Sequence, residues 1–111
     1  MKNLIIILAT LALTSTTTFA TTLPGSNISV EALDIFTSTS FDADTENLTF
    51  NTVEDISVVQ IFNNNGDMEF LLPVMSNNVQ INKNLFEEGT YKLGFVLEGQ
   101  TQVHFSEVVI K

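Results

Sequence analysis

The stretch that decides the fold is residues 91–97, YKLGFVL. Successive side chains of a β-strand point to opposite faces of a sheet, and apolar residues at every second position are typical of a strand with one buried face. Every second residue here is apolar or aromatic: Tyr91, Leu93, Phe95 and Leu97. We therefore predict a strand over these residues, with this side in the core and Lys92 and Val96 on the other side, together with Gly94.

The same period of two recurs along the chain on the N-terminal side of this stretch. The residues that it assigns to the core are Leu48, Phe50, Val59, Ile61, Val79 and Ile81. The pair Asn65-Gly66 predicts a type I′ hairpin turn, because both residues tolerate a positive φ. A return strand is then expected over residues 67–72, and it should stop near Pro73, which has no N–H for a central ladder.

On the C-terminal side, the turn EGQ (98–100) leads into a last strand. Val103 and Phe105 share one phase of this strand, and Val108 and Ile110 share the other. If both apolar pairs face the core, the strand needs a β-bulge near Ser106 or Glu107. In total, about seven short strands at hairpin spacing and no helical period predict a small antiparallel β-sandwich of immunoglobulin-like architecture, with a small barrel as the alternative.

The first 20 residues have the order of a secretory signal peptide: a basic start at Lys2, an apolar run over residues 4–13, and small residues up to Ala20. The apolar run is too short to span a bilayer. We therefore expect residues 1–20 to be a signal peptide, residues 21–40 a short lead-in with a possible first strand, and residues 41–111 one β domain. The mature chain, without a transmembrane segment, is expected in the periplasm, at the cell surface or outside the cell.

The formal net charge of −9 argues against binding to nucleic acid or to anionic membranes, which would repel the chain. Because the sequence has 0 Cys, no disulfide can stabilise the domain, and its stability must come from packing.

Candidate chemistry is sparse, and we expect neither an enzyme nor a cofactor. His104 is the one histidine, and no oxyanion-hole motif accompanies it. Asp42, Asp44 and Glu46 alternate along FDADTE and form a candidate calcium cluster, since oxygen-rich groups bind this ion. The glycine-bearing turn of an EF-hand loop is missing, however, so the sequence favours a solvated loop.

Three ordered motifs give the chain a family resemblance. The first is VVQIFNNNG (58–66), the second is LFEEGTY (85–91), and the third is the apolar and basic run VVIK (108–111) at the C-terminus. Over residues 41–111 this order resembles the C-terminal sorting domain, type A, of the type IX (Por) secretion system of Bacteroidetes. Gly89 and Tyr91 of the second motif match the pattern of that family, and Val108, Val109, Ile110 and Lys111 match its C-terminal end.

The resemblance implies an immunoglobulin-like sandwich that directs secretion across the outer membrane, with its C-terminal strands recognised by the secretion translocon. The alternative, from the fold alone, is a secreted immunoglobulin-like binding or inhibitor module that offers an exposed edge strand to a partner protein.

Overall fold

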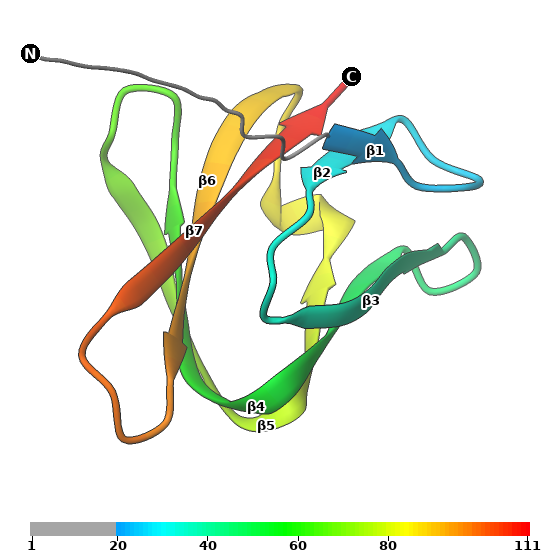
Figure 1. The fold of residues 1–111 in the computed structure, drawn as a ribbon. Helices are drawn as coiled ribbons and strands as arrows, with labels where there is room; N and C mark the ends of the chain where they lie inside the picture. The colour runs from blue at the N-terminus through cyan, green and yellow to red at the C-terminus, as the bar shows by residue number, and fades with distance from the viewer. Residues whose placement is uncertain (1–19) are drawn as a thin grey trace, which may run out of the picture.

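The structure is a computed structural model, and it describes residues 20–111 (Figure 1). Except for Ala20, the predicted signal peptide lies outside the described residues. This part contains seven strands, one turn of 3₁₀ helix and no α-helix. The elements are β1 (Ala20–Thr22), β2 (Ile28–Glu31), β3 (Phe36–Asp42), β4 (Asn47–Phe62), β5 (Met68–Asn82), η2 (Lys83–Leu85), β6 (Gly89–Leu97) and β7 (Val103–Ile110).

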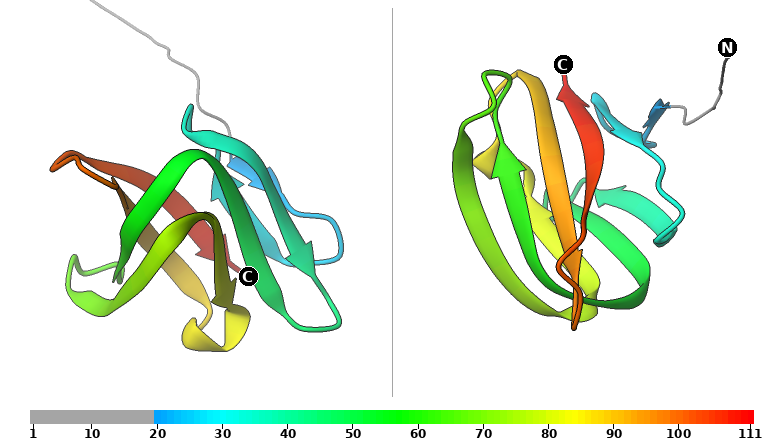
Figure 2. Two further views of the ribbon diagram at one scale, coloured as in Figure 1. Left: turned by 90° about the horizontal axis from the view of Figure 1, so that it is seen from below. Right: turned by 60° about the vertical axis from the view of Figure 1, so that its left-hand side comes forward.

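All strand pairs are antiparallel, and the strands form one sheet in the order β1-β2-β7-β6-β4-β3, with β5 paired to β4. The long strand β4 changes neighbours: its first part pairs with β3 and its second part with β6, while β5 follows both. The sheet curves into a half-barrel (Figure 2). The all-β, seven-stranded, antiparallel prediction is confirmed, but a sandwich of two separate sheets is not, because the pairing is continuous.

The curvature is concentrated at residues 53–55 of β4, three exposed residues between its two paired segments. The ladder with β5 shifts register here, between Asn51 and Ile56. The buried hydroxyl of Thr52 donates a hydrogen bond of 2.7 Å to the backbone carbonyl of Glu54, which satisfies a group that the irregular ladder leaves free. The bend lets β3 and β6 lie on the same side of β4, one after the other.

The core lies on the concave side of this bent sheet. Phe36 of β3 and Phe50 of β4 both contact Phe95 of β6, with ring centroids 5.0 and 5.3 Å apart. These edge-on aromatic contacts join β6 to the β3–β4 hairpin across the half-barrel. The sequence prediction is confirmed for the whole inward set, which is buried: Leu48, Phe50, Val59, Ile61, Val79, Ile81, Tyr91, Leu93, Phe95 and Leu97.

The predicted lead-in contributes strands to the same sheet. Both β2 and most of β3 precede residue 41. Ile28 and Val30 of β2 are buried and pair with Ile110 and Val108 of β7. Residues 28–40 are therefore part of the same packed unit as the strands that follow.

The turn between β4 and β5 is wider than predicted. Gly66 has φ +88°, but Asn65 has no positive φ, so a type I′ turn is wrong. Instead, the Gly66 N–H donates to the Asn63 carbonyl, and the Asn63 N–H donates to the Asp67 carbonyl. The Asn63 side-chain oxygen accepts from the N–H groups of Asn65 and Asp67, at 2.9 and 3.1 Å. This side-chain cap favours the longer turn over the two-residue one.

β5 does not stop at Pro73, as the sequence prediction had it, but runs on to Asn82. Pro73 is tolerated because β5 has only one neighbouring strand, so an N–H on its open side would bond to no strand. The two expected strands on either side of this proline are thus one long edge strand.

β7 is regular, and the predicted bulge is wrong. Its ladder with β6 has no register shift from Val103 to Ile110. Phe105 faces outward, across from Gly94 of β6, and a Cβ built at Gly94 would lie 3.0 Å from the Phe105 ring and 2.8 Å from a Val103 methyl carbon. The absent side chain of Gly94 is therefore what makes room for two apolar residues on the outer face. The buried Ser106 takes the inward position.

No helix in residues 20–111 has the length and apolar character needed to cross a membrane.

Candidate functional site

The six motif residues identified in the sequence meet at one end of strands β6 and β7. Gly89 pairs with Ile110, and Tyr91 pairs with Val108. Gly89 has φ +141°, a conformation that residues with a side chain rarely adopt, and it starts β6 opposite the end of β7. We call Gly89, Tyr91 and residues 108–111 the motif cluster.

The C-terminal part of the motif cluster lies inside the sheet, not at its edge. β7 is bonded to β6 on one side and to β2 on the other, and the Lys111 N–H donates a 3.0 Å hydrogen bond to the Asn27 carbonyl. Val108 and Ile110 are buried, whereas Val109 is half-buried on the outer face and Lys111 is exposed. In the folded chain, a partner that binds residues 108–111 can therefore contact only the side chains of Val109 and Lys111.

Tyr91 holds the connection between η2 and β6. Its ring packs against Phe86, with centroids 4.9 Å apart, and its hydroxyl oxygen accepts a 2.9 Å hydrogen bond from the Glu87 N–H. Only 8% of the residue is exposed. Tyr91 is therefore a structural member of the motif cluster, and its side chain fixes the loop before Gly89.

Two substitutions of Tyr91 separate the contribution of its ring from that of its hydroxyl group. Tyr91→Ala should lower the free energy of unfolding by about 3 to 5 kcal/mol, as for other buried aromatic residues. Tyr91→Phe keeps the ring but leaves the Glu87 N–H without its acceptor, and should cost about 1 kcal/mol. Urea denaturation of both variants measures the difference. Equal stability of Tyr91→Ala and the wild type would show that Tyr91 is not a core residue.

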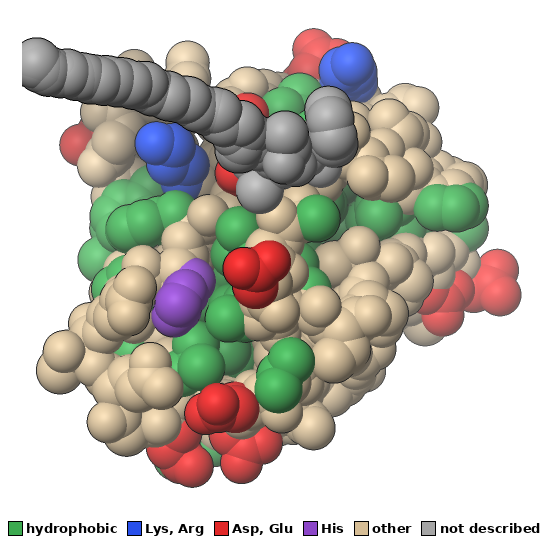
Figure 3. Space-filling view, viewed as in Figure 1, with side chains coloured by type: hydrophobic (Ala, Val, Ile, Leu, Met, Phe, Trp, Pro, Cys, Tyr) green, Lys and Arg blue, Asp and Glu red, His purple; other side chains and the backbone are tan. Residues whose placement is uncertain are grey.

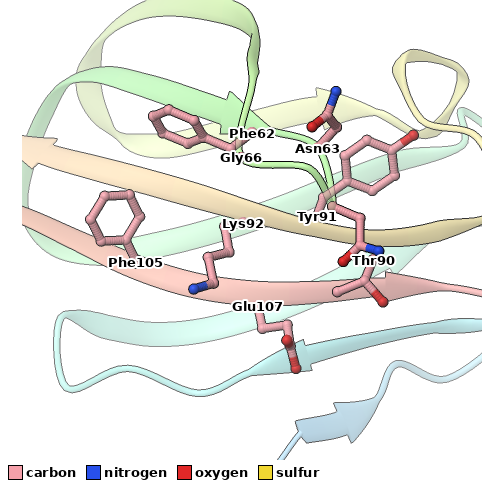
Figure 4. A pocket seen from close by; sticks show the side chains of 9 residues that line it. Phe62, Asn63, Gly66, Thr90, Tyr91, Lys92, Phe105 and Glu107 are labelled. Atoms are coloured by element: carbon pink, nitrogen blue, oxygen red, sulfur yellow. The ribbon is translucent and has the colours of Figure 1, made fainter.

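A groove of about 270 Å³ lies next to the motif cluster on the outer face (Figure 4). It runs between the β4–β5 turn and strands β6 and β7, and the rings of Phe62 and Phe105, 5.9 Å apart, form its apolar end. The residues that line it are Phe62, Asn63, Asn64, Gly66, Thr90, Tyr91, Lys92, Phe105 and Glu107. Among the six motif residues, only Tyr91 lines the groove.

Sequence reasoning missed most of this groove. It placed Phe105 in the core because the residue is apolar, and it assigned no function to Lys92 and Glu107. These two residues are partners in the β6–β7 ladder, and both are exposed. The available signal was the outward phase of Lys92 and Gly94, which predicts that their cross-strand partners Glu107 and Phe105 also face outward.

Charge is unevenly distributed over the face seen in Figure 3. In this view acidic side chains lie at the lower end, in the middle, on the right and near the top, whereas the basic ones lie in the upper part, and hydrophobic side chains are exposed among them. The exposed Lys111 is the one basic side chain of the motif cluster, in a chain whose formal net charge is −9.

Of the candidate calcium residues Asp42, Asp44 and Glu46, the first ends β3 and the other two lie in the turn between β3 and β4. The Asp42 carboxylate accepts a 2.9 Å hydrogen bond from the Asp44 N–H, and the Glu46 N–H donates to the Asp42 carbonyl at 2.6 Å. Among residues 20–111, no three His, Cys, Asp or Glu side chains are grouped closely enough to hold a metal ion. The contacts of Asp42 are those of a residue that stabilises its own turn.

His104 and Ser106 lie on the same face of β7, opposite Phe105. The Ser106 hydroxyl donates a 2.6 Å hydrogen bond to the backbone carbonyl of Glu31, and the Glu107 N–H donates to the Glu31 carboxylate. Ser106 thus ties β7 to the end of β2, and its proton is used in a structural bond.

The geometry therefore offers two adjoining features on β6 and β7: the motif cluster, whose reachable side chains are Val109 and Lys111, and the groove between Phe62 and Phe105. Neither brings together a nucleophile, a base and an oxyanion-stabilising group in the described part of the chain. Comparison of the sequence with protein-family models, with curated proteins and with solved structures gave no match.

Proposed function

We propose that this chain is a non-enzymatic exported β domain of the type IX sorting-domain kind, which directs secretion across the outer membrane of a member of the Bacteroidetes. The observation that supports the proposal is the motif cluster: residues that are 22 positions apart in sequence, Gly89 and Lys111, belong to one small region of β6 and β7. In this proposal the secretion translocon binds the end of β7 through Val109 and Lys111.

The finer fold assignment belongs to the same proposal. An immunoglobulin-like domain packs two sheets face to face around one core. The contacts of Phe95 with Phe36 and Phe50 support this description, because they join β6 to the β3–β4 hairpin across the half-barrel. On this view the bend of β4 is the corner at which one strand passes from the first layer to the second.

The test compares the protein in wild-type cells and in a strain without the type IX translocon. Surface or medium localisation only in the wild type would support the sorting function, and the intact mass would show whether residues 1–20 and the β domain are removed. A periplasmic location in both strains, with only the signal peptide missing, would contradict it.

A substitution in the motif cluster makes the test specific. We expect Val109→Thr combined with Lys111→Glu to leave most of the protein in the periplasm, because both side chains are accessible and the side-chain charge at position 111 changes from positive to negative. The fold should lose little stability, since surface substitutions change the free energy of unfolding by about 0.5 kcal/mol or less. Lys83→Glu, the same charge change on η2, is the control. Normal delivery of the double variant would count against recognition at this segment.

A second candidate is a secreted binding or inhibitor module that acts through an edge strand. The free side of β5 favours it, because this strand has 15 residues and pairs only with β4. An extended segment of another protein can add to such an edge through backbone hydrogen bonds.

A further inference from the structure

The end of β7 is held by a strand on each side (Figure 1). Val109 pairs with Thr90 of β6 and with Ser29 of β2. Chain termini are poorly ordered unless they are tied down, and a strand bonded on one side only is an edge strand. Because β2 occupies the second side, the last residues of β7 form a central strand.

The contacts of β2 reach beyond the three residue pairs of its ladder with β7. At one end, the Lys111 N–H donates to the Asn27 carbonyl at 3.0 Å. At the other end, the Ser106 hydroxyl donates to the Glu31 carbonyl at 2.6 Å, and the Glu107 N–H donates to the Glu31 carboxylate at 3.0 Å. The Glu31 side chain thus supplies an acceptor where the ladder has ended. β2 therefore holds β7 over residues 106–111.

β2 lies outside the part of the chain that resembles a sorting domain, residues 41–111. Ile28 and Val30 of β2 are nevertheless 0% and 2% exposed, so the strand is anchored in the common core. The position of the C-terminal residues in the motif cluster therefore depends on a segment near the other end of the chain.

We propose that docking of β2 against β7 is the condition for recognition of the sorting signal. This inference rests on the proposed function and adds its regulation: the translocon binds Val109 and Lys111 only in chains in which β2 holds the end of β7. When only one conformation binds, the apparent affinity falls with the fraction of molecules in that conformation. A segment that is ordered beforehand also loses less entropy on binding. A chain whose β2 has not docked is therefore not delivered.

Ser29→Pro is the variant that tests this condition. The carbonyls of Asn27 and Glu31 both point toward β7, and alternate residues of a strand direct their backbone groups to the same side, so the Ser29 N–H faces β7 as well. Proline removes this N–H and does not fit a central ladder. In cells, the fraction of the full-length protein delivered to the surface or medium should fall at least about tenfold.

Thr22→Pro is the matched control. The Leu23 N–H donates to the Ile28 carbonyl, so the N–H of the preceding residue, Thr22, faces the open side of β1, where proline is tolerated. Hydrogen exchange of each purified variant shows which part has opened. In Ser29→Pro, amide exchange should become faster at residues 107–111 but not at residues 91–97.

The Glu31 side chain provides a milder test if Ser29→Pro fails to fold. Glu31→Ala should speed exchange of the Glu107 amide and lower delivery about twofold or more, whereas Glu31→Gln keeps an oxygen acceptor and should restore both. Ile81→Val, on β5, lowers overall stability without touching β7, because Ile81 is buried against β4. Equal loss of delivery in Ile81→Val and Glu31→Ala would overturn the proposal, since delivery would then follow stability alone.

Loss of delivery in Ser29→Pro, with residues 107–111 open, the rest of the sheet protected and Thr22→Pro delivered, supports the proposal. Normal delivery of Ser29→Pro with the same open residues overturns it, and so does normal delivery of Glu31→Ala with faster exchange. If the Val109→Thr and Lys111→Glu double variant were also delivered normally, the sorting function itself would fail. If that double variant stays in the periplasm while Ser29→Pro is delivered, only the requirement for β2 fails.

Discussion

Phe95→Ala should lower the free energy of unfolding by about 3 to 5 kcal/mol, the loss expected for a fully buried aromatic side chain. Phe95 is 0% exposed, and its ring contacts Phe36 and Phe50 at centroid distances of 5.0 and 5.3 Å. Its removal leaves a cavity between β6 and the β3–β4 hairpin, which a backbone held by ladders on both sides cannot close. The free energy of unfolding of small domains is about 5 to 15 kcal/mol in total, so this substitution would remove much of the stability.

The measurement is urea denaturation, in which the midpoint should fall while the slope stays the same. Val96→Ala is the control, because Val96 is the next residue of the same strand and faces outward, half-buried. It should cost about 1 kcal/mol or less, the span of strand propensities. If both variants lost the same stability, the aromatic contacts would not be what holds β6 against the β3–β4 hairpin.

Ile110→Ala should cost about 2 to 5 kcal/mol, although the residue is next to last in the sequence. Ile110 is 4% exposed and pairs with Gly89 on one side and with Ile28 on the other. Its side chain closes the core where β2, β7 and β6 meet. Deletion of residues 109–111 should cost at least as much, because it also removes the backbone bond between Lys111 and Asn27.

The same denaturation experiment on Val109→Ala gives the comparison. Val109 faces outward, so its replacement by Ala should lower the free energy of unfolding by about 1 kcal/mol or less. A stable truncated chain would refute the structural role of Ile110. The result also matters for the sorting proposal: a truncation that unfolds the domain stops delivery for a trivial reason, which is why the export test relies on Val109 and Lys111 alone.

Much of the fold could be predicted from the sequence where one face of a strand is buried and the other is not. Leu93 and Phe95, or Val59 and Ile61, alternate with outward residues, and period two then leaves a single choice of face. For β7 the same rule failed. Phe105 is more apolar than Ser106, yet Ser106 is inside because its hydroxyl has a backbone acceptor in Glu31, and Phe105 is outside because Gly94 leaves space for it.

The prediction of where β5 ends was wrong for a related reason. Pro73 ends a strand only if its missing N–H would have faced another strand, and the sequence does not say which strand is at the edge. The sequence predicted which residues belong to the motif cluster but not that they lie together. Their proximity depends on the pairing of Gly89 with Ile110, which requires a regular β7, whereas the sequence analysis predicted a bulge in this strand. The groove between Phe62 and Phe105 was missed with it.

The pairing of β2 with β7 has a consequence for how the chain acquires its structure. Val30 must find Val108, and this contact closes a loop that includes nearly all the other strands. Loop-closure entropy is paid before such a distant contact contributes stability, so sheets of this kind form slowly. A newly made chain that still lacks β7 cannot complete its core at Ile28 and Val30. Synthesis therefore leaves an interval in which β1 to β6 have already been made but the sheet still lacks the strand that joins β2 to β6.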